Sequence, residues 1–417
     1  MNIKWFCRFV SAVFCAVALC TPANAKLATV GAVHDYVREK WEIDIPYRDG
    51  TAGQLLNMKY LMELVDVVNE KLNEVPSSNY AKDSKYATSA IVSTVMGKAA
   101  ADTLIKRECF PNNFCFKPLT TSTGYSFIIS AAGTYHINWG DGTWQDIIKT
   151  DTVATTYSHT YSRAANLYEI SLSGKASAYS TSESTAAITF NDNNMRVREI
   201  RGCLGCIFST IDDELVPSNQ RQPRFFLTFR ANTLNTGIPD NLFYGLHGAP
   251  VSAMFRGLFW DANVNGSIPE NLFAEIEGAP TPDLFNNTFD GSKVSGPLPE
   301  TLFAGIKGPP APRMFRTTFW NLPNLTGSPE KLFAGIDATK PSQASMFNAT
   351  FYNCKSLTGY SPKIGGKYLY DIWSNGGGDT YLSAGKLSDY YCIPTNWGGA
   401  GTKAPGECEP AVEEDDD

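Results

Sequence analysis

The chain has 417 residues, of which 18% are charged, and a formal net charge of −7 at pH 7. An acidic chain of this kind carries no broad positive surface, which excludes nucleic acid and anionic membranes as general partners. Its length exceeds what one compact core usually spans, so two or more domains are expected.

Residues 1–25 predict a secretory signal peptide. Two cations precede a short apolar run, and small residues form a cleavage site that ends at Ala25. The run is too short for a good membrane span, and no later stretch approaches the length of one. The mature chain is therefore expected outside the cytoplasm (secreted, at the cell surface or in the periplasm), with no transmembrane segment. Cys20 as a lipoprotein acceptor is the alternative, although Leu19 stands where such sites need a small residue.

The chain has ten cysteines, three of them in the signal peptide. In an oxidising compartment near neighbours are the natural disulfide partners, which predicts Cys109 with Cys115, Cys203 with Cys206, and Cys392 with Cys408. Cys354 is left over and is expected to be a small buried side chain. The spacing of Cys203 and Cys206 also occurs in redox and zinc sites. A second such pair is missing, so neither a metal nor a cofactor is predicted.

Residues 26–115 predict an N-terminal helical region. Apolar residues recur at helical spacing from about 52 to 74, and a second helical candidate runs from about 85 to 105. The two helices could pair as a hairpin or oligomerise through their apolar faces, and the sequence leaves both possibilities open.

Residues 116–195 show short alternating runs that predict β-strands, with a tight turn at Gly140-Asp141-Gly142. The motifs Trp139-Gly140-Asp141-Gly142-Thr143 and Tyr157-Ser158-His159-Thr160-Tyr161 resemble the polycystic-kidney-disease (PKD) domain, an immunoglobulin-like β-sandwich. The resemblance implies structural roles for Trp139, Asp141, His159 and Tyr161. The chemical alternative is a catalytic triad, but no nucleophile motif such as Gly-x-Ser-x-Gly specifies one.

Residues 196–359 contain a repeat with a period of thirty residues. A proline followed by an acid begins each unit and predicts a short helix. Apolar residues with i to i+4 spacing predict a second helical face. One unit cannot bury its large side chains alone, so the units are expected to stack as a solenoid. The phenylalanines of the recurring Leu-Phe pair are the predicted core residues Phe243, Phe273, Phe303 and Phe333.

The run from Phe351 to Gly359, with its Leu-Thr-Gly ending, resembles BspA-type bacterial surface leucine-rich repeats, and the resemblance extends over residues from about 225 to 359. It implies an extracellular surface that binds proteins or glycans, often in adhesion. The asparagine ladder of standard leucine-rich repeats is missing, so an irregular α/β solenoid is expected.

One position of the repeat carries residues suited to recognition. Arginine and aromatic side chains that recur at one position would form a stripe, with two further arginines near it. The alternative is that the two tryptophans only cover the edge of the core. The candidate binding stripe consists of Arg230, Arg256, Trp260, Asp290, Arg316, Trp320 and Tyr352.

Residues 360–408 are rich in tyrosine and tryptophan and predict a C-terminal cap, with an aromatic sugar-binding module as the alternative. An acidic tail, 409–417, follows. The predicted fold class is multidomain α+β: N-terminal helices, a PKD-type β-sandwich, an irregular α/β leucine-rich-like repeat solenoid and the cap.

These features predict a secreted or cell-surface, non-enzymatic and adhesin-like binding protein that recognises an extracellular protein or glycan through its repeats. A structural spacer or envelope component is the alternative. A polysaccharide hydrolase or its accessory is a third possibility, because PKD-like domains often accompany such enzymes. No pair of carboxylates at recognisable motifs supports catalysis, although glycosidase carboxylates are set by space and not by sequence spacing.

Overall fold

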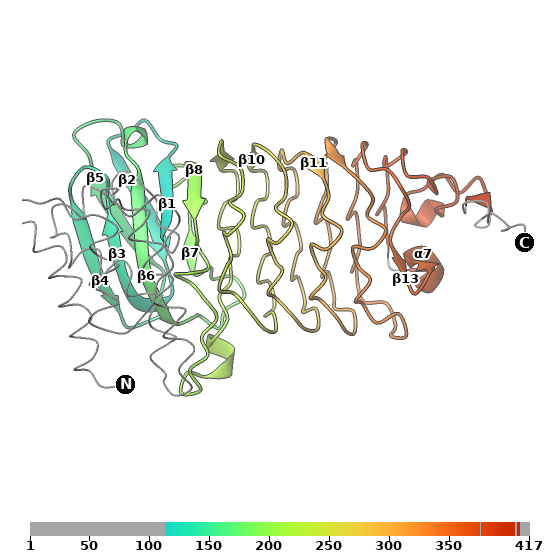
Figure 1. Ribbon diagram of the computed structural model, residues 1–417, viewed down its shortest axis with the longest axis horizontal. Coiled ribbons are helices and arrows are strands. Elements are labelled where there is room, and N and C mark those ends of the chain that lie inside the picture. The colour runs from blue at the N-terminus through green and yellow to red at the C-terminus, as the bar shows by residue number, and fades with distance from the viewer. Residues whose placement is uncertain (1–112, 376, 405–406, 409–417) are drawn as a thin grey trace, which may run out of the picture. The chain divides into compact units, whose positions relative to one another are not determined.

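The computed structural model describes residues 113–375, 377–404 and 407–408 (Figure 1). The chain divides into two compact units, Met1–Glu108 and Cys109–Asp417, and the described residues belong to the second. The signal peptide, the predicted helices within residues 52–105 and the acidic tail lie outside the described residues.

The second unit begins with two facing β-sheets. The larger sheet has the strand order β4-β3-β6-β1-β8, and the smaller has the order β5-β2-β7. All neighbouring strands in both sheets are antiparallel. The strands are β1 (Phe114–Pro118), β2 (Gly124–Ile129), β3 (Ala132–Asn138), β4 (Trp144–Lys149), β5 (Thr155–Thr160), β6 (Ile170–Ala178), β7 (Ile188–Thr189) and β8 (Val197–Gly202).

The core of the two sheets follows from the alternation of side chains along each strand. In β2 every second residue is buried, which directs Tyr125, Phe127 and Ile129 to one face. Phe127 meets Phe116 of the opposing sheet with ring centroids 5.4 Å apart and a nearly perpendicular ring angle. This edge-to-face contact joins the sheets into one aromatic core.

After β8 the chain winds into coils stacked in a row, each about one repeat long (Figure 1). Three rows of backbone hydrogen bonds join each coil to the next. The first contains bonds such as that from Phe255 N–H to the carbonyl of Leu284. The second contains the parallel strand pairs β9 (Thr233–Leu234) with β10 (Asn263–Val264) and β11 (Gly296–Pro297) with β12 (Leu325–Thr326). The third contains parallel bridges such as Gly278 with Ile306.

Columns of phenylalanine rings fill the stack. Phe289, for example, lies 5.6 Å from Phe259 in the preceding coil and 5.7 Å from Phe319 in the next, with nearly parallel rings. Each buried ring contributes roughly 1.5–3 kcal/mol only when neighbouring coils cover it, which is why the repeat must stack. The three columns are Phe225, Phe255, Phe285, Phe315 and Phe347; Phe229, Phe259, Phe289, Phe319 and Phe351; and Phe243, Phe273, Phe303 and Phe333.

A column of buried threonines joins the coils beside the second phenylalanine column. The hydroxyl of Thr288 lies 3.0 Å from the carbonyl oxygen of Phe255 in the preceding coil and 2.8 Å from that of Phe285 in its own. Thr318 and Thr350 repeat this geometry. The threonines thus bond backbone carbonyls between coils, which is the task of the asparagine ladder that the sequence lacks.

The fold-class prediction is wrong. The described residues are mostly short strands and turns, they contain one α-helix, α7 (Leu369–Ile372), and the repeats contain no helix. The six-residue segments after each proline are too short to nucleate a helix. N–H groups inside them, such as those of Ala274 and Ile276, bond the carbonyl three positions back and not four, as in tight turns. The chain is therefore neither α+β nor an α/β solenoid over this range.

The i to i+4 pattern that predicted a helical face has another cause. Every fourth residue has a positive φ, for example Gly257 (62°), Asp261 (53°) and Asn287 (59°), and between them the chain forms consecutive tight turns. Successive turns of this length return Phe255 and Phe259 to the same side, as a helix would.

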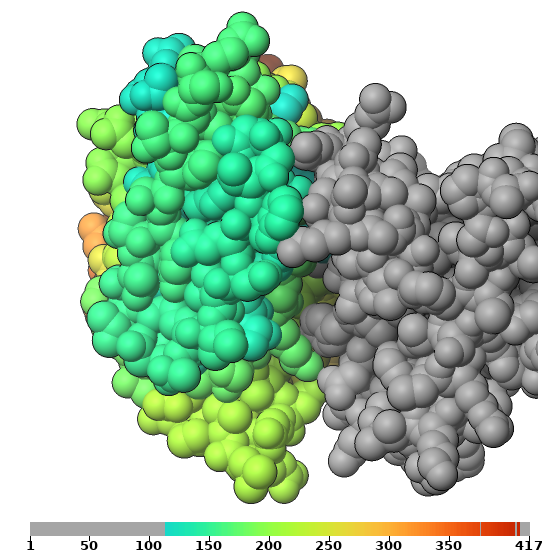
Figure 2. Space-filling view, turned by 90° about the vertical axis from the view of Figure 1, so that its left-hand side faces the viewer, coloured from blue at the N-terminus to red at the C-terminus, as the bar shows by residue number. Residues whose placement is uncertain are grey.

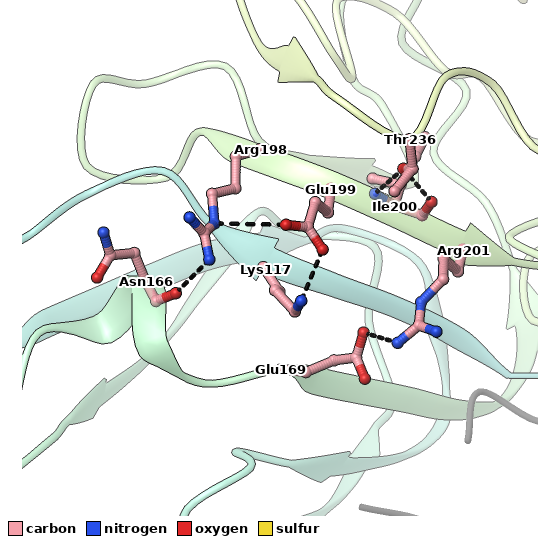
Figure 3. A network of polar contacts seen from close by, with 8 residues as sticks. All are labelled: Lys117, Asn166, Glu169, Arg198, Glu199, Ile200, Arg201 and Thr236. Carbon is pink, nitrogen blue, oxygen red and sulfur yellow. Dashed lines mark hydrogen bonds and ion pairs between the residues drawn. The ribbon is translucent and has the colours of Figure 1, made fainter. Parts of the chain in front are cut away.

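The sandwich closes the first end of the stack. Phe190 stacks on Phe229 of the first coil at 5.6 Å, so the second phenylalanine column continues into the sandwich core. Figure 3 shows the polar contacts beside it: the hydroxyl of Thr236 bonds both the N–H and the carbonyl of Ile200. In the space-filling view from this end, the sandwich residues form a continuous surface (Figure 2).

The other end of the stack is closed by residues after 360. Tyr381 stacks on Phe351 at 5.8 Å and ends the same column. The remaining elements are β13 (Lys363–Ile364), β14 (Lys367–Tyr368), and the 3-10 helices η2 (Ala165–Leu167), η3 (Ser218–Gln220) and η4 (Thr395–Trp397).

Candidate functional site

The candidate binding stripe follows one line along the stack. Its central members lie one per coil, and the backbone beside them is bonded from coil to coil. Ala231 N–H donates to the carbonyl of Trp260, and Gly291 N–H donates to that of Trp320. The stripe therefore follows the same repeat as the adjacent phenylalanine column, whose successive ring centroids are 5.6 to 5.7 Å apart.

Neighbouring side chains of the stripe contact one another at both of its ends. The guanidinium carbon of Arg230 lies over the ring of Trp260, 4.3 Å from its centroid. At the other end the rings of Trp320 and Tyr352 are 5.7 Å apart and inclined by only 20°. All four side chains are half-buried. The structure thus brings the predicted aromatic and arginine residues together as two contacting pairs.

Asp290 differs from the rest of the stripe because it is only 6% exposed. The side-chain amide of Asn287 donates a hydrogen bond to its carboxylate. Burial, with a smaller contribution from the nearby Asp261, raises the pKa of Asp290 to about 6, although Asn287 and Arg316 oppose the shift. A ligand on the surface therefore meets the two tryptophans and not this carboxylate.

Arg256 and Arg316 are the exposed members of the stripe. Each precedes a tryptophan by four residues, so Arg256 with Trp260 and Arg316 with Trp320 form the same pair two coils apart. Within the described range neither guanidinium has a carboxylate at salt-bridge distance. The guanidinium carbon of Arg256 lies 5.4 Å from the ring centroid of Phe226. Two exposed cations thus flank the coil that contains Asp290.

An ion pair next to the stripe was missed by sequence reasoning. Asp283 accepts two hydrogen bonds from Arg313 of the next coil, at 2.9 and 2.6 Å. Burial alone would raise the pKa of Asp283, but the bonds from Arg313 and Asn286 lower it below the usual value. The signal in the sequence was the pair of opposite charges at one repeat position, thirty residues apart. This arginine is occupied by its ion pair, unlike Arg256 and Arg316.

The structure brings together the four residues of the two PKD-like motifs. His159 Nε2 lies 2.7 Å from a carboxylate oxygen of Asp141, and its ring stacks on Trp139 at 5.1 Å. The hydroxyl of Tyr161 donates to the carbonyl of Trp139 at 2.9 Å. These contacts fasten the turn after β3 to strand β5.

The same cluster does not have the geometry of a triad. The hydroxyl of Thr143 donates to Asp141 at 2.6 Å, and the imidazole of His159 bonds the same carboxylate. In a triad the imidazole would lie between the hydroxyl and the acid. Burial would raise the pKa of Asp141, but the hydrogen bonds from Thr143 and His159 outweigh it and lower that pKa.

Two of the predicted disulfides are confirmed: Cys203 with Cys206, and Cys392 with Cys408. Cys115 is disulfide-bonded, and its predicted partner Cys109 lies outside the described residues. Cys354 has a free thiol that is fully buried, and burial raises its pKa to about 12. A thiol with this pKa is a packing group and not a nucleophile.

The aromatic residues of the C-terminal segment lie mostly in the core. Tyr381 and Trp397 are buried and stack on each other at 6.2 Å. Asp389 is also buried, and its carboxylate accepts hydrogen bonds from Ser361 and Tyr370. These rings close the stack, and Tyr391 is the exposed aromatic side chain of this segment, which weakens the sugar-binding alternative for residues 360–408.

Among the residues that the structure describes, no group of three or more His, Cys, Asp or Glu side chains is arranged to hold a metal ion. No helix in the same range is long and apolar enough to cross a membrane. Comparison of the chain with protein-family models, with curated proteins and with solved structures found no match.

Proposed function

We propose that this protein is a secreted or cell-surface, non-enzymatic and adhesin-like binding protein, and that it recognises a protein or glycan through the stripe on its repeats. The observation that carries the proposal is the arginine–tryptophan pair that recurs on alternate coils, Arg256 with Trp260 and Arg316 with Trp320. Arginine and tryptophan are the residue types that contribute most often to binding energy at interfaces.

The exposure of the arginines favours recognition over a purely structural role. If the two tryptophans only covered the edge of the core, the arginine near each of them would be expected to have a structural partner of its own. Arg313, three residues before Arg316, shows how a structural arginine is used here, because it bonds Asp283. Arg256 and Arg316 make no such bond within the described residues.

An extracytoplasmic location fits this function. The described residues contain two disulfides within the chain, and such bonds persist mainly in oxidising compartments. The predicted signal peptide and the resemblance to PKD domains and to BspA-type surface repeats point to the same location. Recognition at the cell surface or in the surrounding medium is thus the function that these features jointly support.

The experiment that tests the proposal uses point variants. The sandwich and the stack share one core, so deleting the repeats would expose that core and confuse binding with unfolding. Trp260→Ala with Trp320→Ala is therefore compared with the parent on a panel of extracellular-matrix proteins and glycans, alongside urea unfolding. Loss of binding with unchanged unfolding supports the proposal. Binding that persists in the double variant contradicts it.

A further inference from the structure

The stripe has a period of its own, which is two coils. Arg256 and Arg316 occupy the same position two coils apart, and Trp260 and Trp320 do the same four residues later. In the coil between them the corresponding residues are Asn286 and Asp290, and both are buried. The exposed surface thus alternates between coils that present an arginine–tryptophan pair and a coil that presents neither.

The backbone fixes this period. Gly257 N–H donates to the carbonyl of Asn286, and Asn287 N–H donates to the carbonyl of Arg316, so three successive coils are bonded directly beside the arginines. Backbone segments bonded in this way lie about 4.8 Å apart, which is the length of one coil step. The bases of the two exposed cations are therefore held two such steps apart. A matching ligand must present anionic groups at about that interval along its length.

Candidate polymers differ in this interval. In an extended peptide, side chains on one face recur about every 6.6 Å, which is longer than one coil step and shorter than two. In a DNA double helix the phosphates of one strand follow each other about every 3.4 Å along the helix axis, which is closer still. In an extended polysaccharide that carries a carboxylate or sulfate on every second sugar, the anionic groups recur once per disaccharide, a length close to two coil steps.

We infer that the stripe binds an anionic polysaccharide with a disaccharide repeat, lying along the stack with its charged groups on Arg256 and Arg316. This inference rests on the proposed function and specifies its ligand class. The half-exposed Trp260 and Trp320 then contact the sugars beside the charged groups, since tryptophan offers both an apolar ring and an N–H donor. The net negative charge of the chain opposes every polyanion, so the attraction must come from the two arginines themselves.

The test measures binding of the mature chain to hyaluronan oligosaccharides of increasing length by titration calorimetry. A disaccharide reaches one arginine only, whereas a tetrasaccharide or longer chain spans both. The longer oligosaccharides should therefore bind more tightly. Added salt should lower their affinity, because it screens the charges of the two exposed arginines. Arg316→Ala should abolish the difference in affinity between short and long oligosaccharides. Arg256→Ala with Arg316→Ala should lower the affinity for the octasaccharide by about tenfold or more.

Matched controls separate spacing from charge. Arg163→Ala with Lys386→Ala removes two exposed cations outside the stripe and should leave affinity unchanged. Poly-glutamate and a single-stranded oligonucleotide of equal charge should bind weakly or not at all. Equal affinity for these polyanions, equal effects of the two double variants, or no binding of any acidic oligosaccharide would each overturn the inference.

The outcome also separates this inference from the proposed function. A protein ligand that depends on Trp260 and Trp320 while hyaluronan does not bind would leave recognition by the stripe intact and refute the polysaccharide. If every ligand on the panel binds the tryptophan variant as tightly as the parent, both the proposed function and the polysaccharide inference are refuted.

Discussion

Replacement of Asp290 by asparagine is predicted to stabilise the protein at neutral pH. The pKa of this carboxyl is raised from 3.8 to about 6 in the folded chain, first by burial and then by the nearby Asp261. The ionised form is thus less favourable in the folded chain than in the unfolded chain, and it costs stability at pH 7. One pKa unit corresponds to about 1.4 kcal/mol, so the cost is about 3 kcal/mol before solvent screening and roughly 1–3 kcal/mol after it.

The sign of the pH dependence follows from the same shift. Between about pH 4 and pH 6 the folded chain holds a proton on Asp290 that the unfolded chain has lost. The stability of the parent should therefore rise as the pH falls from 7 towards 4, and Asp290→Asn should remove this contribution. Asp141 and Asp283 affect stability only in more acidic solution. Their pKa values lie below 3.8, so their carboxylates stabilise the folded chain until the pH falls through those values.

Urea unfolding followed by tryptophan fluorescence at pH 7.5 and pH 5 measures the effect. Asp240→Asn, at an exposed carboxyl in the same stack, is the matched control and should change neither value by more than a few tenths of a kcal/mol. A loss of stability in Asp290→Asn at pH 7.5 would refute the reasoning, because it would show that the carboxylate is stabilising where it lies.

Three further substitutions test the fold. Phe303→Ala leaves a cavity in the middle of the third column, beside Phe285 at 4.4 Å, and should lower the free energy of unfolding by about 3–5 kcal/mol in urea titration; an unchanged midpoint would contradict the stacked core. Thr317 is a β-branched residue with a φ of 50°, at a position where the preceding coil has Asn287. Thr317→Asn should relieve this backbone strain and raise the free energy of unfolding by about 1 kcal/mol. A lower urea midpoint would be inconsistent with the turn geometry. Asp141→Ala removes the partner of His159 and should cost about 1–3 kcal/mol at pH 7, and this cost should shrink as the pH falls through the lowered pKa of Asp141; a cost that stays the same in acid would oppose this.

The repeat can be predicted from the sequence because the same residue types recur at a fixed interval of thirty residues. Phe303 and its counterparts recur at a constant interval, and large apolar side chains at one interval must be buried by stacking. Two disulfides could also be predicted, since near neighbours in the sequence are near in space. Such local or strictly periodic signals need no knowledge of how distant segments pair.

The secondary structure of the coils could not be predicted from the same residues. Phe255 and Phe259 have the spacing of a helical face, and only the conformation of the residues between and after them separates a helix from consecutive turns. Glycine, aspartate and asparagine tolerate a positive φ and stand at several of these positions, such as Gly257 and Asp261, but others carry residues such as Ala253 and Thr317, so the signal is incomplete.

The candidate site shows a similar division. The column of arginine and aromatic residues is visible in the sequence, and the contact of Arg230 with Trp260 follows from their repeat position. Asp290 occupies the position that carries tryptophan in the two adjacent coils, and no residue pattern indicates that it is buried there. The ion pair of Asp283 with Arg313 required the pairing between coils to be known.

The most direct test of the account is the binding of the parent and of Trp260→Ala with Trp320→Ala to the panel of extracellular proteins and glycans. The account predicts that the parent binds at least one member and that the variant loses this binding while its urea unfolding stays the same. Retained binding, or a fall in stability that accompanies the loss, would contradict it and would assign the two tryptophans to the edge of the core.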